Sequence, residues 1–113
     1  MMMWGRTNKF GARKTVIDGI CFDSQKEAMR WCELKIMANA GAIEQLQRQI
    51  KFEIIPKTAK FRAHYYIADF VYMENGKKVV EDVKGCRKGI AYQLFRLKQA
   101  IMYWRYEIEV KEI

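Results

Sequence analysis

Two aspartates and a lysine stand close together in the second half of the chain. Asp69 lies inside a run of apolar and aromatic residues, and Asp82 and Lys84 flank Val83. Aspartate is unfavourable in the interior of a strand, and carboxylates that face each other across two strands repel. Carboxylate oxygens are the ligands that Mg²⁺ and Mn²⁺ prefer. The three residues therefore predict a divalent-cation site, and an Asp82–Lys84 surface ion pair is the simpler alternative.

The two aspartates fall in two expected strands that are joined by a tight turn. Residues 62–73 and 78–83 are rich in β-branched and aromatic side chains, as strands are. Between them, Asn75-Gly76 is a strong signal for a two-residue hairpin loop. The two strands are therefore expected to pair antiparallel.

The turn also predicts which residues face each other. Counted outward from a loop at positions 75 and 76, Asp69 faces Asp82 and Ile67 faces Lys84. Side chains alternate between the two faces of a strand, so Asp69, Asp82 and Lys84 share one face of the sheet. Glu81 points to the opposite face, which makes it a weaker candidate for the same site.

Further elements are expected on both sides of this hairpin. The sequence predicts a small hairpin over 15–22, a helix over 24–40, a strand over 51–55, a helix over 90–104 and a strand over 106–113. Apolar residues in the second helix are spaced by four and three, and Leu94 is expected in the core. A crossover helix before the last strand gives parallel pairing. We expect an α/β (α+β) fold of order α-β-β-β-α-β, with a mixed sheet flanked by helices and an N-terminal β-hairpin.

Composition narrows the classes of protein. With 113 residues the chain is one domain's worth, and 21 Lys and Arg against 13 Asp and Glu give a net charge of +8. That charge suits a polyphosphate partner, although a solvated basic face is equally compatible. One histidine and three widely spaced cysteines disfavour a zinc site or a Cys-His mechanism. No apolar run approaches the ~20 residues of a membrane span, and we expect a soluble, cytoplasmic protein.

Several short motifs resemble a known superfamily of nucleases. Ala68-Asp69, a hairpin and then Asp82-Val83-Lys84, on strands in the order given above, resemble the PD-(D/E)xK nucleases. Residues 22–28, 66–70 and 80–85 look like a small family of uncharacterised phage proteins. The chain departs from the superfamily pattern in having Ala68 instead of proline and Asp82 instead of the commoner glutamate. The resemblance implies a restriction-endonuclease-like core for the single domain 1–113, whose residues 1–14 form a basic arm.

The resemblance also implies roles for individual residues. Asp69, Asp82 and the backbone carbonyl of Val83 would hold Mg²⁺ or Mn²⁺, and Lys84 would stand beside the attacking water. Glu27 on the first helix would reach the same metal. The same glutamate also completes a Ser24-x-x-Glu27 helix-capping box, so a purely local role is the alternative.

The implied activity is that of a metal-dependent DNA endonuclease, most naturally a junction-resolving or other structure-specific enzyme that acts as a homodimer. A non-catalytic nucleic-acid-binding phage protein is the main alternative and a structural phage protein is a third, and RNA remains open as a substrate. The expected nucleic-acid contacts are Arg13, Lys14, Arg87, Lys88, Gln93, Arg96 and Lys98.

Overall fold

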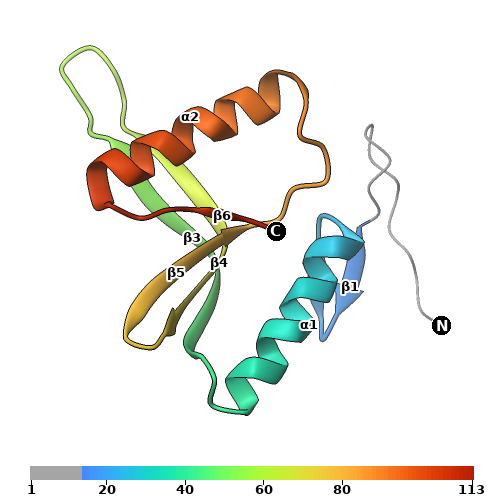
Figure 1. Ribbon diagram of the computed structural model, residues 1–113. Coiled ribbons are helices and arrows are strands. Elements are labelled where there is room, and N and C mark those ends of the chain that lie inside the picture. Colours follow the sequence, from blue (N-terminus) through green and yellow to red (C-terminus); the bar gives the residue numbers. More distant parts are fainter. Residues whose placement is uncertain (1–13) are drawn as a thin grey trace.

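The structure is a computed structural model, and it describes residues 14–113 (Figure 1). The elements are β1 (Thr15–Ile17), β2 (Ile20–Phe22), α1 (Gln25–Asn39), β3 (Glu44–Ile55), β4 (His64–Glu74), β5 (Lys77–Asp82), α2 (Gly89–Tyr106) and β6 (Lys111–Glu112). The expected order, a hairpin followed by α-β-β-β-α-β, is confirmed. Within residues 14–113, neither helix is long and apolar enough to cross a membrane.

The larger sheet is mixed, as the crossover helix predicted. Its strand order is β3-β4-β5-β6, and β1 and β2 form a separate two-stranded hairpin. β3, β4 and β5 pair antiparallel, whereas β6 runs parallel to β5 after α2 has crossed over. The β4–β5 register runs from Glu74 opposite Lys77 to Phe70 opposite Glu81, as the Asn75-Gly76 turn predicted.

Two hydrophobic clusters cover opposite faces of the sheet. The cluster under α1 contains Phe22, Ala28, Trp31, Leu34, Ile43, Phe70 and Tyr72. The cluster under α2 contains Ile54, Tyr66, Ala68, Val71, Val80, Phe95, Met102 and Val110. Neighbouring residues on β4, such as Val71 and Tyr72, belong to different clusters because side chains alternate along a strand. Figure 1 shows the two helices lying over different parts of the sheet.

The side-chain alternation of β4 reverses at Asp69. Tyr66 and Ala68 belong to the α2 cluster, but Phe70, again two residues on, belongs to the α1 cluster. In the partner strand β3, Gln49 lies between the two register pairs on either side of Asp69 and has a left-handed backbone, with φ 55°. That conformation is rare for a residue with a side chain other than Asn or Asp. The paired strands therefore turn their inner faces from one helix to the other at this point.

Two strand boundaries differ from those expected. β3 begins at Glu44 rather than at residue 51, because its polar first half pairs with the end of β4 through a register shift between Glu44 and Gln47. β6 is much shorter than the expected 106–113. α2 continues to Tyr106, and Glu107 ends it in the left-handed conformation, with φ 56°. The alternating pattern that follows contributes only Lys111–Glu112 to the sheet.

The expectation that Leu94 lies in the core is wrong. Leu94 is 50% exposed, and Phe95 and Met102 are the buried residues of α2. Phe95 packs against Tyr66 in the sheet, with 6.3 Å between the ring centroids. α2 carries apolar residues on two sides, so the spacing of four and three alone does not determine which side faces the sheet.

Candidate functional site

The two aspartates lie where β5 separates from β4. The last β4–β5 pair is Phe70 opposite Glu81, whereas β4 stays paired with β3 as far as His64. The expected continuation of the ladder, with Ile67 opposite Lys84, does not form. Asp69 and Asp82 instead flank the opening of a fork between the strands. We call Glu27, Asp69, Asp82 and Lys84 the fork site.

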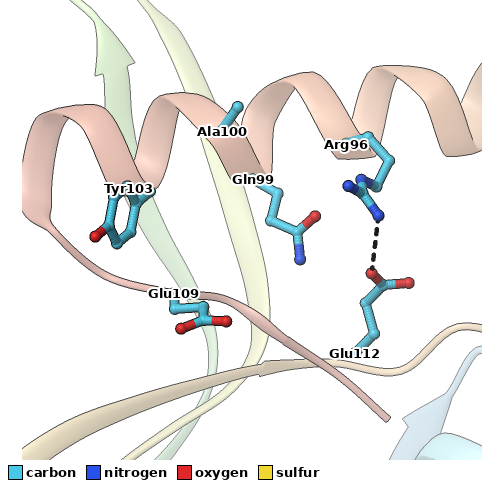
Figure 2. A pocket seen from close by; sticks show the side chains of 6 residues that line it. All are labelled: Arg96, Gln99, Ala100, Tyr103, Glu109 and Glu112. Atoms are coloured by element: carbon cyan, nitrogen blue, oxygen red, sulfur yellow. Dashed lines mark ion pairs between the residues drawn. The ribbon is translucent and has the colours of Figure 1, made fainter.

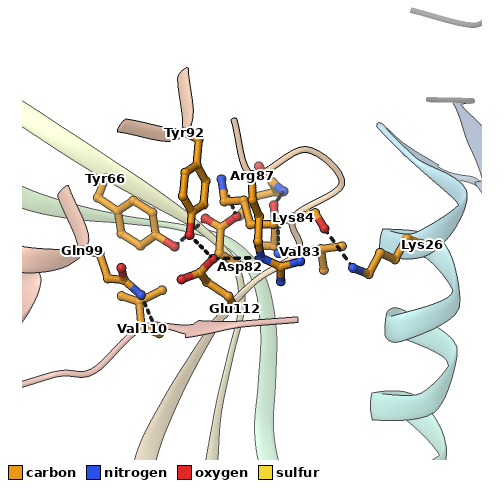
Figure 3. A network of polar contacts seen from close by, with 12 residues as sticks. Lys26, Tyr66, Asp82, Val83, Lys84, Arg87, Tyr92, Gln99, Val110 and Glu112 are labelled. Atoms are coloured by element: carbon orange, nitrogen blue, oxygen red, sulfur yellow. Dashed lines mark hydrogen bonds and ion pairs between the residues drawn. The ribbon is translucent and has the colours of Figure 1, made fainter. Parts of the chain in front are cut away.

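Asp82 is buried, and both of its carboxylate oxygens have partners. The Tyr66 hydroxyl donates to Oδ2 at 2.6 Å, and the Lys84 Nζ lies 3.1 Å from Oδ1 (Figure 3). Burial and the Asp82 carboxylate raise the pKa of Tyr66, so its hydroxyl remains a donor. Only 9% of the Asp82 side chain is exposed. Asp82 and Lys84 do form the ion pair that the simpler interpretation expected, but the pair is largely buried and does not lie at the surface.

Lys84 is held on three sides. Its ammonium lies 3.8 Å from the centre of the Phe95 ring as well as beside Asp82. Its backbone amide donates to the Ile113 carbonyl at 3.1 Å, and its own carbonyl accepts from the Lys26 Nζ at 2.8 Å (Figure 3). These contacts fix the position of the Lys84 side chain, which is only 21% exposed.

Asp69 is tied to the strand that carries Asp82. The Val83 amide donates to Asp69 Oδ2 at 2.8 Å, which places Val83 beside the first aspartate, as expected of a shared site. The Gln49 side chain approaches Oδ1 at 3.4 Å. Burial, followed by the charge of Asp82, raises the pKa of Asp69. The negative charge of Asp82 thus opposes ionisation of Asp69, and the Val83 amide and Lys84 act in the other direction.

Glu27 takes part in the helix cap through its backbone, and its carboxylate is buried beside a cation. Its backbone amide donates to the Ser24 Oγ at 3.0 Å, so the helix cap forms. Its carboxylate is 6% exposed and lies 4.0 Å from the Arg48 guanidinium. Burial, followed by the charges of Asp69 and Asp23, raises the pKa of Glu27 to about 7. The cap uses the backbone, which leaves the side chain available to the fork site.

The raised pKa of Glu27 predicts a pH-dependent stability. The folded state holds an extra proton between pH 4.5 and about 7, so the free energy of unfolding decreases as the pH rises through that range. In metal-free buffer we expect Glu27→Gln to be more stable than wild type at pH 8, by roughly 3 kcal/mol at most. The difference should vanish near pH 4.5. Thermal unfolding in EDTA across this range measures it, and a variant less stable than wild type at pH 8 would contradict the buried, ionised state.

Glu81 points to the opposite face from Asp82, as predicted. It is 1% exposed and accepts two hydrogen bonds from Arg30, at 2.8 and 2.6 Å, together with one from the Tyr72 hydroxyl. This network joins α1 to β5 directly behind the fork site. The network positions α1, the helix that carries Glu27. The Glu81 carboxylate is used by these hydrogen bonds and is not available as a metal ligand.

The donor set of the fork site suits a hard divalent cation. Within residues 14–113, no three acidic, histidine or cysteine side chains gather closely enough to enclose a metal on their own. Mg²⁺ is usually held by one or two carboxylates and keeps several waters. Asp69 and Asp82, with the Val83 carbonyl, match that smaller set, and Glu27 faces the same charges from α1.

The expected nucleic-acid contacts are only partly brought together. Lys98 lines a cavity of about 260 Å³ with Asp82 and Lys84, which we call the Asp82 pocket. Arg87 and Arg96 both turn to Glu112, at 3.2 and 3.8 Å. The remaining described candidates, Lys14, Lys88 and Gln93, are exposed. Arg13 and most of the basic arm lie outside the described residues.

A larger cavity of about 540 Å³ lies on the other flank of α2, away from the fork site (Figure 2). Arg96, Gln99 and Tyr103 line it from the helix, and Glu109 and Glu112 line it from the C-terminal segment. Tyr92 and Arg87 hold Glu112 from the neighbouring turn (Figure 3). Glu112 is thus engaged by these two side chains, and no fork-site residue lines this cavity.

Three residues that hold the fork site were missed in the sequence. Tyr66, Gln49 and Lys26 all contact fork-site residues at least sixteen positions away along the chain. Tyr66 lies in the aromatic run around Asp69. Side-chain alternation along the strand places it on the same face as Ala68, but it does not show that the hydroxyl contacts Asp82. No pattern in the sequence marked Gln49 or Lys26.

Fold and site together define a small α+β protein with a buried and a half-buried aspartate and a positioned lysine at the fork of its central strands. The chain belongs to the DUF1064 family, described as a protein of unknown function, whose model matches residues 7–112. No curated protein and no solved structure matches the chain. The function therefore has to be argued from the fork site.

Proposed function

We propose that this protein is a metal-dependent DNA endonuclease of the PD-(D/E)xK type. The observation that carries the proposal is the placement of the Lys84 ammonium 3.1 Å from Asp82, beside Asp69 at the strand fork. A binding protein for a polyanion gains nothing from buried carboxylates, which repel phosphate. A phosphodiester hydrolase uses them to hold a cation and uses the lysine to stabilise charge on the phosphate.

In this proposal Asp69, Asp82 and the Val83 carbonyl hold Mg²⁺ or Mn²⁺, with Glu27 adding a carboxylate from α1. The bound cation would polarise the scissile phosphate and lower the pKa of a bound water. The Tyr66 hydroxyl orients Asp82 through a 2.6 Å hydrogen bond. The Val83 amide orients Asp69. Such supporting hydrogen bonds typically change metal affinity or activity by about 10–100-fold when they are removed.

The substrate in this proposal is DNA, bound mainly through its phosphates. The net charge of +8 supplies the attraction, and Lys98 places one cation at the Asp82 pocket. Phosphate contacts position a duplex and DNA shape is read without base contacts, so branched DNA recognised by shape is the substrate in this proposal. Cys21, Cys32 and Cys86 are free thiols. A cytoplasmic, phage-related role is part of the proposal.

The proposal is tested by cleavage of labelled DNA. Purified protein is incubated with four-way junction, flap, nicked and linear duplex substrates, in Mg²⁺, in Mn²⁺ and in EDTA. We expect cleavage of branched substrates in either metal and none in EDTA. Binding to every substrate without cleavage in any metal would instead support the non-catalytic binding protein, and an RNA panel run in parallel identifies a ribonuclease.

Replacing Lys84 separates chemistry from binding. Because its ammonium is positioned at the fork, we expect Lys84→Ala to lower the single-turnover cleavage rate by roughly 10²-fold or more. Affinity for DNA at moderate salt should weaken only modestly, because one cation among many is lost. Rates at saturating DNA and affinities across a salt series measure the two effects.

Lys88→Ala is the matched control. Lys88 precedes α2, and its side chain makes no capping hydrogen bond, so its loss removes one exposed charge only. We expect weaker binding with a nearly unchanged rate at saturating DNA. Identical behaviour of Lys84→Ala and Lys88→Ala would show that Lys84 merely binds phosphate.

A further inference from the structure

The outward side of α2 carries an apolar stripe that nothing described in the chain covers. Trp104 is 78% exposed, Ile90 83%, Leu97 57% and Leu94 50%. In chain order these positions are separated by four, three and seven residues, which keeps them on one side of a helix, away from the buried Phe95. The complete stripe, which we call the α2 stripe, consists of Ile90, Gln93, Leu94, Leu97, Ala100, Ile101 and Trp104. Ile101, at its edge, is half-buried against the α2 cluster, and the other six residues are exposed.

The α2 stripe is unusual in carrying no charged residue as well as in being exposed. None of its seven residues is charged, in a chain with 21 Lys and Arg. A helix that is apolar on both sides is normally covered on both sides. A stripe without cations is poorly suited to a phosphate backbone, which is bound by Lys and Arg. The stripe therefore suits a protein surface that is equally uncharged.

We propose that a second copy of this chain covers the α2 stripe, with the two α2 helices packed antiparallel about a two-fold axis at Leu97. A two-fold interface must present the same patch from both copies. The stripe is symmetric about Leu97 in this sense, because each member has a mate at the same distance on the other side. Ile90 then meets Trp104 of the other copy, and Leu97 meets its own equivalent.

The remaining mates in the α2 stripe also fit in size. Leu94 would meet Ala100, and Gln93 would meet Ile101, so a large side chain lies against a small or flexible one. The spacing of four and three over two heptads is the spacing of helices that pack side by side, with knobs of one in holes of the other. The pattern that failed to predict the core of α2 is thus accounted for by a contact between molecules.

Electrostatics supports a second copy and predicts how salt acts on the dimer. Two chains of net charge +8 repel, so they associate most readily through an uncharged face. Arg96 and Lys98 flank the stripe, and Arg96 is partly neutralised by Glu112 at 3.8 Å. Added salt screens the remaining repulsion. The dimer should therefore tighten with salt, whereas nucleic-acid binding weakens.

The α2 stripe and the Asp82 pocket share a residue. Leu94 belongs to the stripe and also lines the pocket with Asp82 and Lys84. A second copy bound to the stripe would border the Asp82 pocket of the first copy. By symmetry, the first copy would border the Asp82 pocket of the second. This inference does not rest on the proposed nuclease activity, because its test measures molecular mass.

The test is sedimentation equilibrium of the full chain and of two variants at the symmetry axis. We expect a dimer for wild type and a dimer dissociation constant raised by about 100-fold or more for Leu97→Glu and for Leu97→Lys, because each brings like charges together. Mixing the two variants should restore the dimer. Ile36→Glu is the matched control, because Ile36 is 69% exposed on α1 and should leave the dimer intact.

The direction of packing is tested by a second mixture. Ile90→Glu and Trp104→Lys should each weaken the dimer, and their mixture should restore it only if the helices are antiparallel. A monomeric wild type at 100-fold the concentration needed for cleavage assays would overturn the proposal, as would Leu97 variants that remain dimeric. Unchanged melting temperatures show that every variant is folded, since all these positions are exposed.

Discussion

Asp69→Asn and Asp82→Asn are each expected to lower the single-turnover rate of Mg²⁺-dependent DNA cleavage by roughly 10³-fold or more. Asparagine keeps the size of the side chain and one of its oxygens, so the hydrogen bonds from Val83 and Tyr66 retain an acceptor. What is lost is the negative charge that would hold the cation. Cleavage of the preferred branched substrate, measured with enzyme in excess, gives the effect directly.

The same variants should leave the fold intact and bind DNA more tightly. Burial and mutual repulsion already disfavour the ionised form of Asp69, so removing its charge costs no stability in metal-free buffer. Glu109→Gln is the matched control, since Glu109 lines the cavity on the other flank of α2. It should cleave at the wild-type rate. Wild-type cleavage by either aspartate variant would show that the metal is held elsewhere.

Glu81→Ala is expected to be strongly destabilising, lowering the free energy of unfolding by about 3 kcal/mol. The change leaves the Arg30 guanidinium without the two hydrogen bonds that it donates at 2.8 and 2.6 Å. It also leaves the buried Tyr72 hydroxyl without its acceptor. Urea unfolding followed by circular dichroism measures the loss.

A neighbouring glutamate gives this experiment its control. Glu33 pairs with the same Arg30 at 3.6 Å, but its side chain is 65% exposed, whereas that of Glu81 is 1% exposed. Exposed pairs contribute about 0–1 kcal/mol, so Glu33→Ala should be nearly neutral. Equal and small effects of the two substitutions would show that the buried network does not hold α1 to β5.

The strand pairing around the site was predictable because one turn determines it. Asn75 adopts φ 53° and Gly76 φ 77°, the left-handed pair that a two-residue hairpin loop needs. From that turn the register follows residue by residue, and with it the opposite orientations of Glu81 and Asp82. The end of the pairing at Phe70 was not predictable, because no turn or proline marks it.

Other features depend on contacts that local patterns do not contain. The reversal at Asp69 needs Gln49 in a left-handed conformation, which glutamine seldom adopts. The rotation of α2 was ambiguous because the helix is apolar on two sides, and only packing of Phe95 on Tyr66 decides between them. The burial of Glu27 likewise depends on Arg48 of β3, a residue twenty-one positions away.

The parallel strand β6 also sets the order in which a newly made chain becomes complete. The backbone of Ile113 donates to the Asp82 carbonyl at 2.9 Å and accepts from the Lys84 amide at 3.1 Å. At synthesis rates of about 5–20 residues per second, the segment from Lys84 to Ile113 takes on the order of seconds to emerge. Until then, a ribosome-bound chain can form the β3–β4–β5 meander but not the strand that secures Lys84. Maturation of the fork site is thus delayed until Ile113 has emerged from the ribosome.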